Sequence, residues 1–396
     1  MSAVIESIIP TQQSPIQRAR APSEFPDSPL SQAFKQPLML GLFLNLQDMQ
    51  RSTIPTSNTW TFDYNTKIVQ QGEALGFELA FSRTQWLPKG GYDGEASLDS
   101  FIALGAMAAA TSKIMLISTM HVLYGPLHPL HIAKYGATLD HIAKGRWGIN
   151  IVTGHRAIEH EMFGWQRIEH DQRYALSAEL FDVVESLWSS DEDFWHQGRQ
   201  GWAVNRGFIT PKPQFGRPVL VNATGSDAGI DFAARYSDII FVTSPGGSGI
   251  DAALATLPAH TAQIRQAAER HGRTVRTLIN PVIVSRDTDA ETEAYADAIV
   301  AGKKPDAKPG SNAKGQVYDS DAHAWRGRKD GTRNVGRGLG GNIEIVGTPE
   351  QVVEQLIALK AAGIDGIQIG FFDFEKDLAH FGASILPLLK SAGLRL

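Results

Sequence analysis

The sequence predicts a single α/β barrel of the TIM (β/α)8 type, in which eight parallel strands alternate with helices. Two observations predict it. Eight short apolar runs follow one another between residues 38 and 369, and helical spacing separates each run from the next. Strands that are buried on both faces appear as continuous apolar runs, and repeated strand–helix units imply a parallel sheet. Eight such units favour a closed barrel over an open doubly wound sheet.

The expected strands share a short, mostly apolar run bounded by turn or helix signals. They are Leu38–Leu44, Phe77–Phe81, Ile114–Thr119, Trp147–Val152, Val219–Asn222, Ile239–Val242, Thr277–Val284 and Gly366–Ile369. The expected helices have apolar residues three or four positions apart. They are Asn65–Leu75, Ser97–Ser112, Pro129–Ile142, Gln172–Trp188, Ala228–Tyr236, Ala252–His271, Ala290–Ala301, Pro349–Ala362 and a last helix within Asp373–Ser391.

The barrel is expected to span residues 37–396. Three segments of the chain depart from the alternation of strands and helices. Residues 1–36 are rich in Pro, Gln and Ser and predict an irregular N-terminal arm, either lying on a neighbouring subunit or disordered. Residues 191–215 predict an excursion beside the fifth strand. Residues 303–341 form a longer interruption with six glycines and several basic residues between 322 and 341. We expect a mobile lid over an anionic cofactor or substrate here, with a solvated loop as the alternative.

Composition narrows the function classes. The chain of 396 residues has a formal net charge of −5 and a pI near 6.2, which argues against nucleic acid or an anionic membrane as the main partner. It has no cysteine, which excludes disulfides, thiolate catalysis and iron–sulfur clusters. The first residues lack the pattern of a secretory signal, and no apolar stretch is long enough to span a bilayer. A cytoplasmic enzyme is therefore expected.

In a barrel of this type the active site lies at the C-terminal ends of the strands. The polar residues that follow the apolar runs are mostly amides and hydroxyls. They include Asn45, Ser82, Arg83, Thr84, Gln85, Thr119, His121, Asn150, Thr153, Asn222, Thr224, Ser226, Thr243 and Ser244. Paired carboxylates, a persuasive metal-ligand spacing and a Gly-x-Ser-x-Gly motif are missing, so hydrolase and metal chemistry are not indicated. Amides and hydroxyls suit a flat cofactor with a polar edge.

One turn suggests a phosphate site. Gly225-Ser226-Asp227 precedes the helix that starts near Ala228, and a helix N-terminus offers free N–H groups to an anion. Arg173 and Tyr174, at the start of another helix, could add a cation and a phenol to the same phosphate. An ordinary capped helix is the alternative interpretation of this tripeptide.

The stretch Ala137–Gly154 resembles the bacterial luciferase-like superfamily, specifically its two-component FMN-dependent monooxygenases. Glu159 and the runs His170–Tyr174, Ala223–Gly229 and Ala234–Asp238 are similar to pyrimidine oxygenases. The run Val346–Gly382 is similar to dimethylsulfone and alkanesulfonate monooxygenases. The resemblance covers residues 37–392, and its motifs indicate the family without indicating a substrate.

The resemblance implies roles for individual residues. Asn150 would hydrogen-bond the flavin with Thr119 beside it, and both would line the pocket where oxygen meets reduced flavin. The other implied contacts all involve FMN itself: Thr84, Gln85 and Glu159 near the ring, and Arg173, Tyr174 and Ser226 at the phosphate. Position 85 is Gln where pyrimidine oxygenases have Lys, so uracil cannot be carried over as the substrate.

The implied reaction uses FMNH2 from a separate NAD(P)H-dependent flavin reductase, and O2 as co-substrate. A flavin peroxide would then oxidise a small organosulfur compound or a nitrogen heterocycle. His121 is a candidate for proton transfer, with a purely structural histidine as the alternative. The resemblance also suggests a homodimer or homotetramer. Two other functions stay open: a deazaflavin-dependent hydride-transfer oxidoreductase of the same fold, and a non-catalytic flavin-binding protein.

Overall fold

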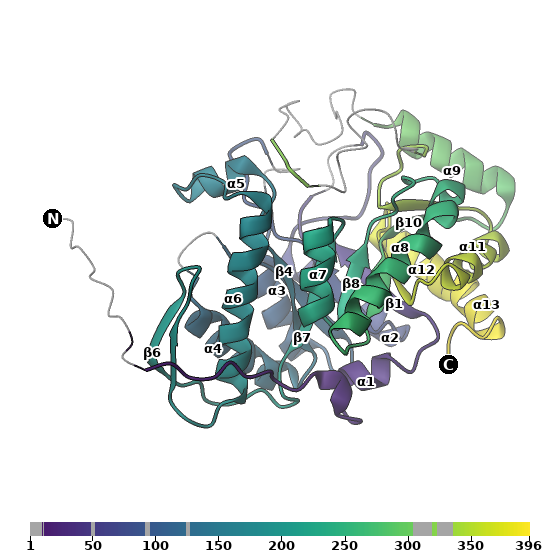
Figure 1. Cartoon of the computed structure of the whole chain (residues 1–396). Helices are drawn as coiled ribbons and strands as arrows, with labels where there is room; N and C mark the ends of the chain where they lie inside the picture. Colours follow the sequence, from purple (N-terminus) through teal and green to yellow (C-terminus); the bar gives the residue numbers. More distant parts are fainter. Residues whose placement is uncertain are drawn as a thin grey trace.

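A computed structural model describes residues 10, 12–48, 52–91, 96–123, 127–303, 319–322 and 336–396. Eight parallel strands form a closed barrel in the order β1-β12-β9-β8-β7-β4-β3-β2, which confirms the predicted fold (Figure 1). The barrel strands are β1 (Met39–Leu44), β2 (Leu79–Ser82), β3 (Met115–His121), β4 (Trp147–Val152), β7 (Val219–Thr224), β8 (Ile239–Val242), β9 (Arg276–Ile279) and β12 (Gly366–Ile369).

Helices surround the barrel between successive strands. They are α2 (Phe62–Ala74), α3 (Ser100–Met107), α4 (Pro129–Ala143), α5 (Ala157–Met162), α6 (His170–Ser189), α7 (Asp227–Tyr236), α8 (Ile250–Arg270), α9 (Asp289–Ala301), α11 (Pro349–Ala361), α12 (Phe374–His380) and α13 (Leu386–Ser391). None of the helices that the structure describes is long and apolar enough to cross a membrane.

One expected strand was wrong in its extent. The run Thr277–Val284 divides into β9, which stays in the barrel, and β10 (Pro281–Val284), which pairs with β11 (Ile343–Val346) outside it. Pro281 has no N–H group to continue the barrel ladder. The Asn280 side chain instead donates to the Gln368 carbonyl oxygen at 2.7 Å, and the chain leaves the barrel there.

Two further segments differ from the simple alternation. The excursion at residues 191–215 contains a hairpin of β5 (Phe194–Gln197) and β6 (Ala203–Gly207). The second expected helix, Ser97–Ser112, corresponds to α3 and begins later than its apolar pattern, because the Asp99 carboxylate accepts the Ile102 N–H at 2.9 Å and caps the helix at Ser100.

Strand side chains alternate between the barrel interior and the helix layer. At the N-terminal end of the barrel, the interior is filled by apolar side chains in one cluster. They are Met39, Leu79, Met115, Val219, Ile239 and Leu278. Leu30 and Ala33 of the short helix α1 (Pro29–Ala33) pack into the same cluster, and Leu30 is fully buried. Helix α1 therefore closes this end of the barrel, opposite α5 in Figure 1.

Residues 12–36 lie on the barrel of their own chain, whereas the sequence had left a neighbouring subunit or disorder as alternatives. The arm runs along β5, where Ser14 N–H donates to the Trp195 carbonyl at 2.8 Å and Ser14 Oγ accepts from Trp195 N–H at 3.0 Å. It continues along α6, where Gln17 N–H donates to Ser186 Oγ at 2.9 Å. These contacts position Arg18 against the outer surface of the barrel base.

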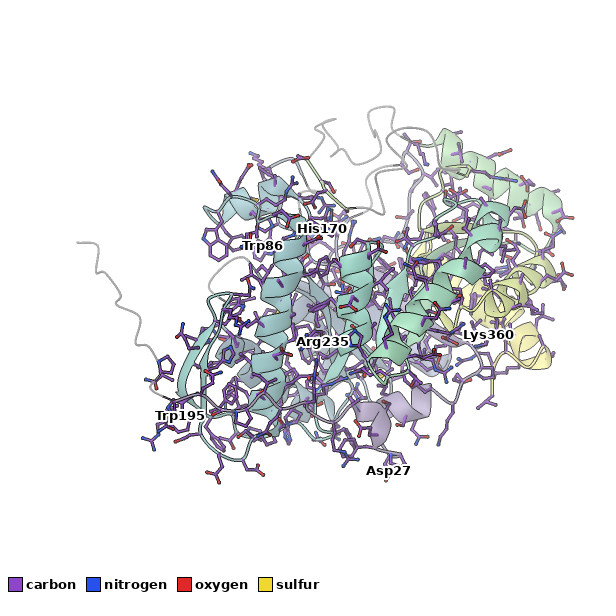
Figure 2. The ribbon with its side chains drawn as sticks, in the orientation of Figure 1. Asp27, Trp86, His170, Trp195, Arg235 and Lys360 are labelled. Atoms are coloured by element: carbon purple, nitrogen blue, oxygen red, sulfur yellow. The ribbon has the colours of Figure 1, made fainter. Side chains whose placement is uncertain are left out.

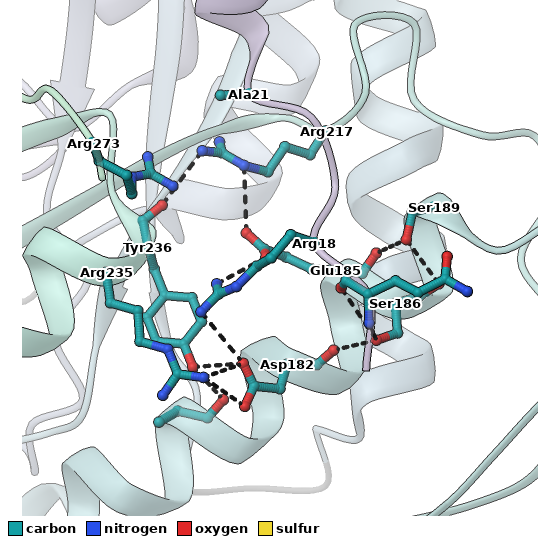
Figure 3. A network of polar contacts seen from close by, with 12 residues as sticks. Arg18, Ala21, Asp182, Glu185, Ser186, Ser189, Arg217, Arg235, Tyr236 and Arg273 are labelled. Carbon is teal, nitrogen blue, oxygen red and sulfur yellow. Dashed lines mark hydrogen bonds and ion pairs between the residues drawn. The ribbon is translucent and has the colours of Figure 1, made fainter. Parts of the chain in front are cut away.

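A network of buried charges lies beneath this arm (Figure 3). Arg217 is fully buried and donates two hydrogen bonds to Asp238 at 2.6 and 2.7 Å. Glu185, also fully buried, lies 2.9 Å from Arg18 and 3.5 Å from Arg217. Arg18 also stacks over the Tyr236 ring, with 4.3 Å between the guanidinium carbon and the ring centroid. Each buried carboxylate here has a guanidinium partner.

Candidate active site

The C-terminal ends of the barrel strands lie at the end of the molecule that carries α5. Figure 2 shows Trp86 and His170 at this end, with Asp27 at the opposite end. The residue types change along the barrel axis, from the apolar cluster at the base to hydroxyls and amides at this mouth. This is the end where the sequence placed the candidate residues.

Thr119 and Asn150 come from adjacent strands and are register partners between β3 and β4. Asn150 Nδ2 donates to Thr119 Oγ1 at 3.0 Å, and both side chains are buried, with exposures of 2% and 4%. The other amide atom, Asn150 Oδ1, is buried without a hydrogen-bond partner among the described residues. A buried acceptor of this kind is costly unless a ligand satisfies it.

Thr84 supports this pair from the neighbouring strand. Its hydroxyl donates to the Thr119 carbonyl at 3.3 Å and accepts from Ser100 N–H at 3.3 Å. The Ser100 hydroxyl in turn accepts from Thr119 N–H at 3.1 Å and donates to the Ser82 carbonyl at 2.8 Å. The start of α3 thus fixes the ends of β2 and β3 relative to each other.

A second group surrounds Glu159, a fully buried carboxylate on α5. Its Oε1 accepts from Arg156 at 3.2 Å and from Trp86 N–H at 3.3 Å. Its Oε2 lies 4.0 Å from His121 Nε2. The Gln85 amide faces the same arginine, and its oxygen accepts from both Arg156 nitrogens at 3.2 and 3.1 Å when oriented toward them. The structure therefore brings Gln85, His121 and Glu159 together through Arg156.

His121 is neutral in this environment. Its side chain is buried on β3, and burial lowers its pKa to about 4 although the Glu159 carboxylate opposes the shift. Burial also lowers the pKa of His155 well below its usual value, and Arg156 adds to this effect. Two neutral imidazoles therefore lie near the mouth at neutral pH.

A third group lies at the N-terminus of α7. Ser226 caps this helix, since its Oγ accepts from Gly229 N–H at 3.2 Å. A Cβ at Gly229 would collide with Thr224 Oγ1, and it would lie 2.7 Å from the Tyr174 hydroxyl and 3.0 Å from Ser226 Oγ. Three hydroxyls therefore converge on a position that only glycine leaves open. Burial raises the pKa of the Tyr174 phenol, so this hydroxyl stays protonated and able to donate. We call Thr224, Tyr174, Ser226 and Gly229 the hydroxyl cradle.

Arg173 lies next to Tyr174 in sequence but is already bound by the protein. Its side chain is 1% exposed and donates to the Ile168 carbonyl at 2.6 Å and to Asp321 at 2.9 Å. Asp321 belongs to the segment 319–322, which lies within the 303–341 interruption. A phosphate would have to compete with this carboxylate for the guanidinium group.

The segment 319–322 is docked on the loop after β4. Asp321 N–H donates to the His155 carbonyl at 3.1 Å, and Ala157 N–H donates to the Asp319 carbonyl at 3.1 Å. The His155 ring and Ser320 Oγ lie 2.7 Å apart. At the other end of the interruption, Arg337 forms an exposed ion pair with Glu293. The other basic residues of the expected lid lie outside the described residues: His323, Arg326, Arg328, Lys329 and Arg333.

Sequence reasoning missed several residues at this mouth. Arg156 lies four residues after the end of β4. A search of the residues that follow each strand could therefore have found it. Gly229 lies inside a helix pattern, where a glycine has no distinctive signal. Asp321 could not be paired with Arg173, because 148 residues separate them in the chain. Within the described ranges, no cluster of His, Asp and Glu has the composition of a metal site.

The fold and the sequence match known proteins. A sequence family described as luciferase-like monooxygenase matches residues 41–366. The FMNH2-dependent dimethylsulfone monooxygenase of Pseudomonas fluorescens strain Pf0-1 is 32% identical over 348 residues, which are 86% of this chain and 90% of the relative. The pyrimidine monooxygenase RutA of Pseudomonas syringae pv. syringae strain B728a is 33% identical over 339 residues, 84% of this chain and 90% of the relative.

Solved structures share the barrel at lower identity. EDTA monooxygenase (EmoA) from Chelativorans sp. BNC1 superposes with a TM-score of 0.74 at 22% identity, covering 91% of this chain and 95% of that one. An F420-dependent secondary alcohol dehydrogenase has a TM-score of 0.65 at 18% identity, with coverage of 91% and 99%. These likenesses concern the fold, whereas the sequence match establishes the family. The chain belongs to the luciferase-like monooxygenase family and is an enzyme of that class.

Proposed function

We propose that this protein is a cytoplasmic, FMNH2- and O2-dependent monooxygenase that acts on a small organosulfur compound or nitrogen heterocycle. The observation that carries the proposal is the division of the mouth into a cradle of neutral donors at α7 and a buried amide pair at Thr119 and Asn150. The two relatives, which are named for dimethylsulfone and for a pyrimidine, support the substrate class. The name of the first relative supports FMNH2 as the flavin form. A separate NAD(P)H:flavin reductase that supplies the reduced flavin is part of the proposal.

The hydroxyl cradle fits a phosphate group. The Tyr174 phenol and the Thr224 hydroxyl are donors, and the first turn of α7 contributes backbone N–H groups that point out of the helix. The missing Cβ at Gly229 lets these hydroxyls approach the start of α7 closely. Neutral donors and a helix dipole bind a dianion without any buried cation in direct contact. Thr224, Tyr174 and Ser226 would hold the FMN phosphate, and Arg173 would join them only after releasing Asp321.

The amide pair fits the edge of a flavin ring. Among the residues that the structure describes, Asn150 Oδ1 is an acceptor without a partner, and its orientation is fixed because Nδ2 is bound to Thr119. A flavin ring supplies N–H donors along its edge, and reduced FMN supplies the electrons that activate O2. Asn150 would therefore orient the ring, while Thr119 would place its hydroxyl beside the reacting edge.

The His121 group would manage protons and exclude water. Because burial lowers its pKa to about 4, the His121 imidazole stays neutral at neutral pH and can donate or accept a hydrogen bond. A proton passing through it during turnover would lie near the buried Glu159 carboxylate, whose Oε2 is 4.0 Å from His121 Nε2. Arg156 holds Glu159 and faces Gln85, so the group is constrained before any ligand binds. Trp86 packs edge-on against Phe163 at 5.2 Å and shields the outer side of this group.

A single-turnover experiment tests the proposal. The protein is mixed anaerobically with FMNH2 and then with 18O2, in the presence of dimethylsulfone in one sample and uracil in another. Reoxidation of the bound flavin is followed by absorbance, and products are analysed by mass spectrometry. We expect saturable FMNH2 binding, and 18O in an organic product from one of these substrates or from a wider panel of sulfones and heterocycles.

Two other outcomes separate the alternatives. Failure to bind FMNH2, combined with binding of a reduced deazaflavin, would favour hydride transfer. Binding of FMNH2 without incorporation of oxygen into any member of the panel would favour a non-catalytic flavin carrier. The variant Asn150→Leu tests the role of the amide directly. It removes the acceptor Oδ1 and keeps a side chain of similar size. We expect FMNH2 binding to weaken by about tenfold in this variant.

A further inference from the structure

The last barrel strand contributes an inward-facing amide that none of the site groups above includes. Side chains of β12 alternate, with Ile367 and Ile369 in the layer between barrel and helices and Gln368 on the inner face. Gly41 of β1 is the register partner of Gln368. A Cβ placed on Gly41 would lie 3.4 Å from Gln368 Cγ, which shows that the glutamine side chain lies over the inner face of β1.

The strand registers place Gln368 in one layer of the barrel interior with three other side chains. Layers in such barrels take one residue from every second strand. The layer here consists of Phe81 from β2, Asn150 from β4, Phe241 from β8 and Gln368 from β12. The Phe81 and Phe241 rings meet across the barrel, with centroids 5.0 Å apart. Gln368 and Asn150 therefore come from opposite walls of the same layer, in which the Phe81 and Phe241 rings form an aromatic floor for the layer above.

Both amides of this layer have an unsatisfied atom. Gln368 is 1% exposed, and its Nε2 has no hydrogen-bond partner in the part of the chain that the structure describes. Asn150 Oδ1, an acceptor, is likewise buried without a hydrogen-bond partner among the described residues. A buried amide donor without a partner destabilises a folded protein, and an apolar side chain of the same shape would avoid that cost. The position therefore has the properties of a binding site rather than of a packing position.

We propose that Gln368 is a flavin-positioning residue, which donates a hydrogen bond from Nε2 to a carbonyl oxygen of the isoalloxazine ring. This inference rests on the proposed function, since it assumes that FMN binds at this mouth. The pyrimidine end of the ring carries carbonyl oxygens on both sides of an N–H group. A donor on one wall and an acceptor on the other match such an edge, and Asn150 and Gln368 supply that combination.

The layer above this floor is open to solvent on the side of β7. It contains Phe43, whose ring packs at 4.9 Å from Phe81, and Ala223, whose small side chain is exposed although it faces the interior. Solvent thus reaches the interior beside β7, the strand that leads into the hydroxyl cradle. A flavin with its phosphate in the cradle would enter from β7 and extend its ring toward β12. Gln368 would then meet the end of the ring farthest from the phosphate.

The test compares Gln368→Met with the wild-type protein. Methionine keeps the length of the side chain and removes the donor. We expect an apoprotein with an equal or higher unfolding temperature, together with about tenfold weaker binding of FMNH2 in an anaerobic titration. Gln355→Met on α11 is the matched control. The Gln355 amide already donates to the Val346 and Gln351 carbonyls, so its loss leaves flavin binding unchanged.

A spectroscopic measurement distinguishes a direct contact from a packing effect. Infrared difference spectra of bound, oxidised FMN are expected to show a flavin carbonyl band that moves to higher frequency in Gln368→Met. Gln368→Asn, which withdraws the amide by one methylene group, is expected to give the same shift and keeps the test independent of how methionine packs. Unchanged affinity and unchanged carbonyl bands in both variants would overturn the inference and leave the proposed function intact. Failure of the wild-type protein to bind FMN would instead overturn the proposed function.

Discussion

The two ends of this barrel use opposite kinds of contact. At the base, apolar side chains fill the interior, α1 closes it, and the buried carboxylates Glu185 and Asp238 have guanidinium partners. At the mouth, hydroxyls and amides face the interior, and Asn150 and Gln368 retain buried atoms without partners among the described residues. At the base, the charged groups Arg217, Asp238 and Glu185 neutralise one another within the protein, although Glu185 Oε1 and Arg217 Nε lack a hydrogen bond among the described residues. At the mouth, the atoms without partners are neutral amide groups that face the barrel interior, where we propose that a ligand binds.

Because of this difference, we expect the residues that stabilise the fold and the residues that bind the flavin to lie at opposite ends of the barrel axis. Substitutions at the base should lower the free energy of unfolding without a specific effect on flavin binding. Substitutions at the mouth should weaken flavin binding and leave stability nearly unchanged, or increase it. Proteins commonly retain locally unfavourable groups only where function requires them.

The largest effect is expected at the base, from Arg217→Met. The substitution leaves the buried carboxylates of Asp238 and Glu185 without their central partner, and breaking a buried pair in this way costs about 3–5 kcal/mol. Urea unfolding followed by circular dichroism measures the change. Arg206→Ala removes an exposed ion pair with Asp193 and should leave the unfolding midpoint unchanged. Equal effects of the two variants would refute the distinction.

Gly229→Ala should have the largest effect at the mouth. The added methyl group would push the Thr224 and Tyr174 hydroxyls out of the hydroxyl cradle, so these donors would no longer face the phosphate. We expect FMNH2 binding to weaken by about 10- to 100-fold. Gly136→Ala provides the matched control, since it crowds another buried helical glycine, 3.0 Å from Trp188, at the base. We expect the control to lower the unfolding temperature and to keep the flavin dissociation constant. A weaker effect of Gly229→Ala on binding than that of Gly136→Ala would contradict the placement of the phosphate.

A smaller effect tests the role of Arg173. Asp321→Asn removes the carboxylate that holds this guanidinium group, so Arg173 becomes available to an anion. If Arg173 binds the phosphate, FMNH2 should bind several-fold more tightly than in the wild-type protein, as seen by anaerobic fluorescence titration. Asp319→Asn, on the exposed carboxylate 2.9 Å from Arg167, is the control and should leave binding unchanged. Unchanged or weaker binding in Asp321→Asn would limit the phosphate contacts to the neutral cradle.

The smallest effect concerns pH. The pKa of His121 is lowered to about 4 by burial, whereas a histidine in the unfolded chain has a pKa near 6.5. Between these values the unfolded state binds more protons, so stability should fall as the pH decreases through this window. The unfolding temperature of His121→Asn should therefore decrease less steeply between pH 6.5 and 4.5 than that of the wild-type protein. Parallel slopes would show that His121 has the same pKa in the folded and unfolded states, which would contradict its neutral state at the mouth.

The sequence predicted the fold well because the barrel strands are apolar on both faces. Short elements were missed for a physical reason: α1 has five residues and α5 has six, too few for a helical periodicity to appear. The boundary at Asn280 combines a local signal, the missing N–H group of Pro281, with a side-chain contact to β12 that no local pattern encodes.

The candidate site was predictable where residues follow strands, as for Thr119 and Asn150. Gln368 was not, because it lies inside a run that otherwise resembles a buried strand, and only the barrel register shows that it faces Asn150 across the interior. Similarly, the contact of Arg18 with Glu185 joins segments 167 residues apart. Such pairings follow from closure of the barrel and from long-range packing, which the local sequence does not reveal.

The central claim is that the polar mouth is a site for reduced FMN whose phosphate lies in the hydroxyl cradle. The most direct measurement is an anaerobic titration of the wild-type protein and Gly229→Ala with FMNH2 and, separately, with reduced riboflavin. We expect the wild-type protein to bind FMNH2 more tightly than reduced riboflavin, and Gly229→Ala to bind the two with similar, weaker affinity. Equal affinities of the wild-type protein for the two flavins, or no saturable binding of either, would contradict the claim.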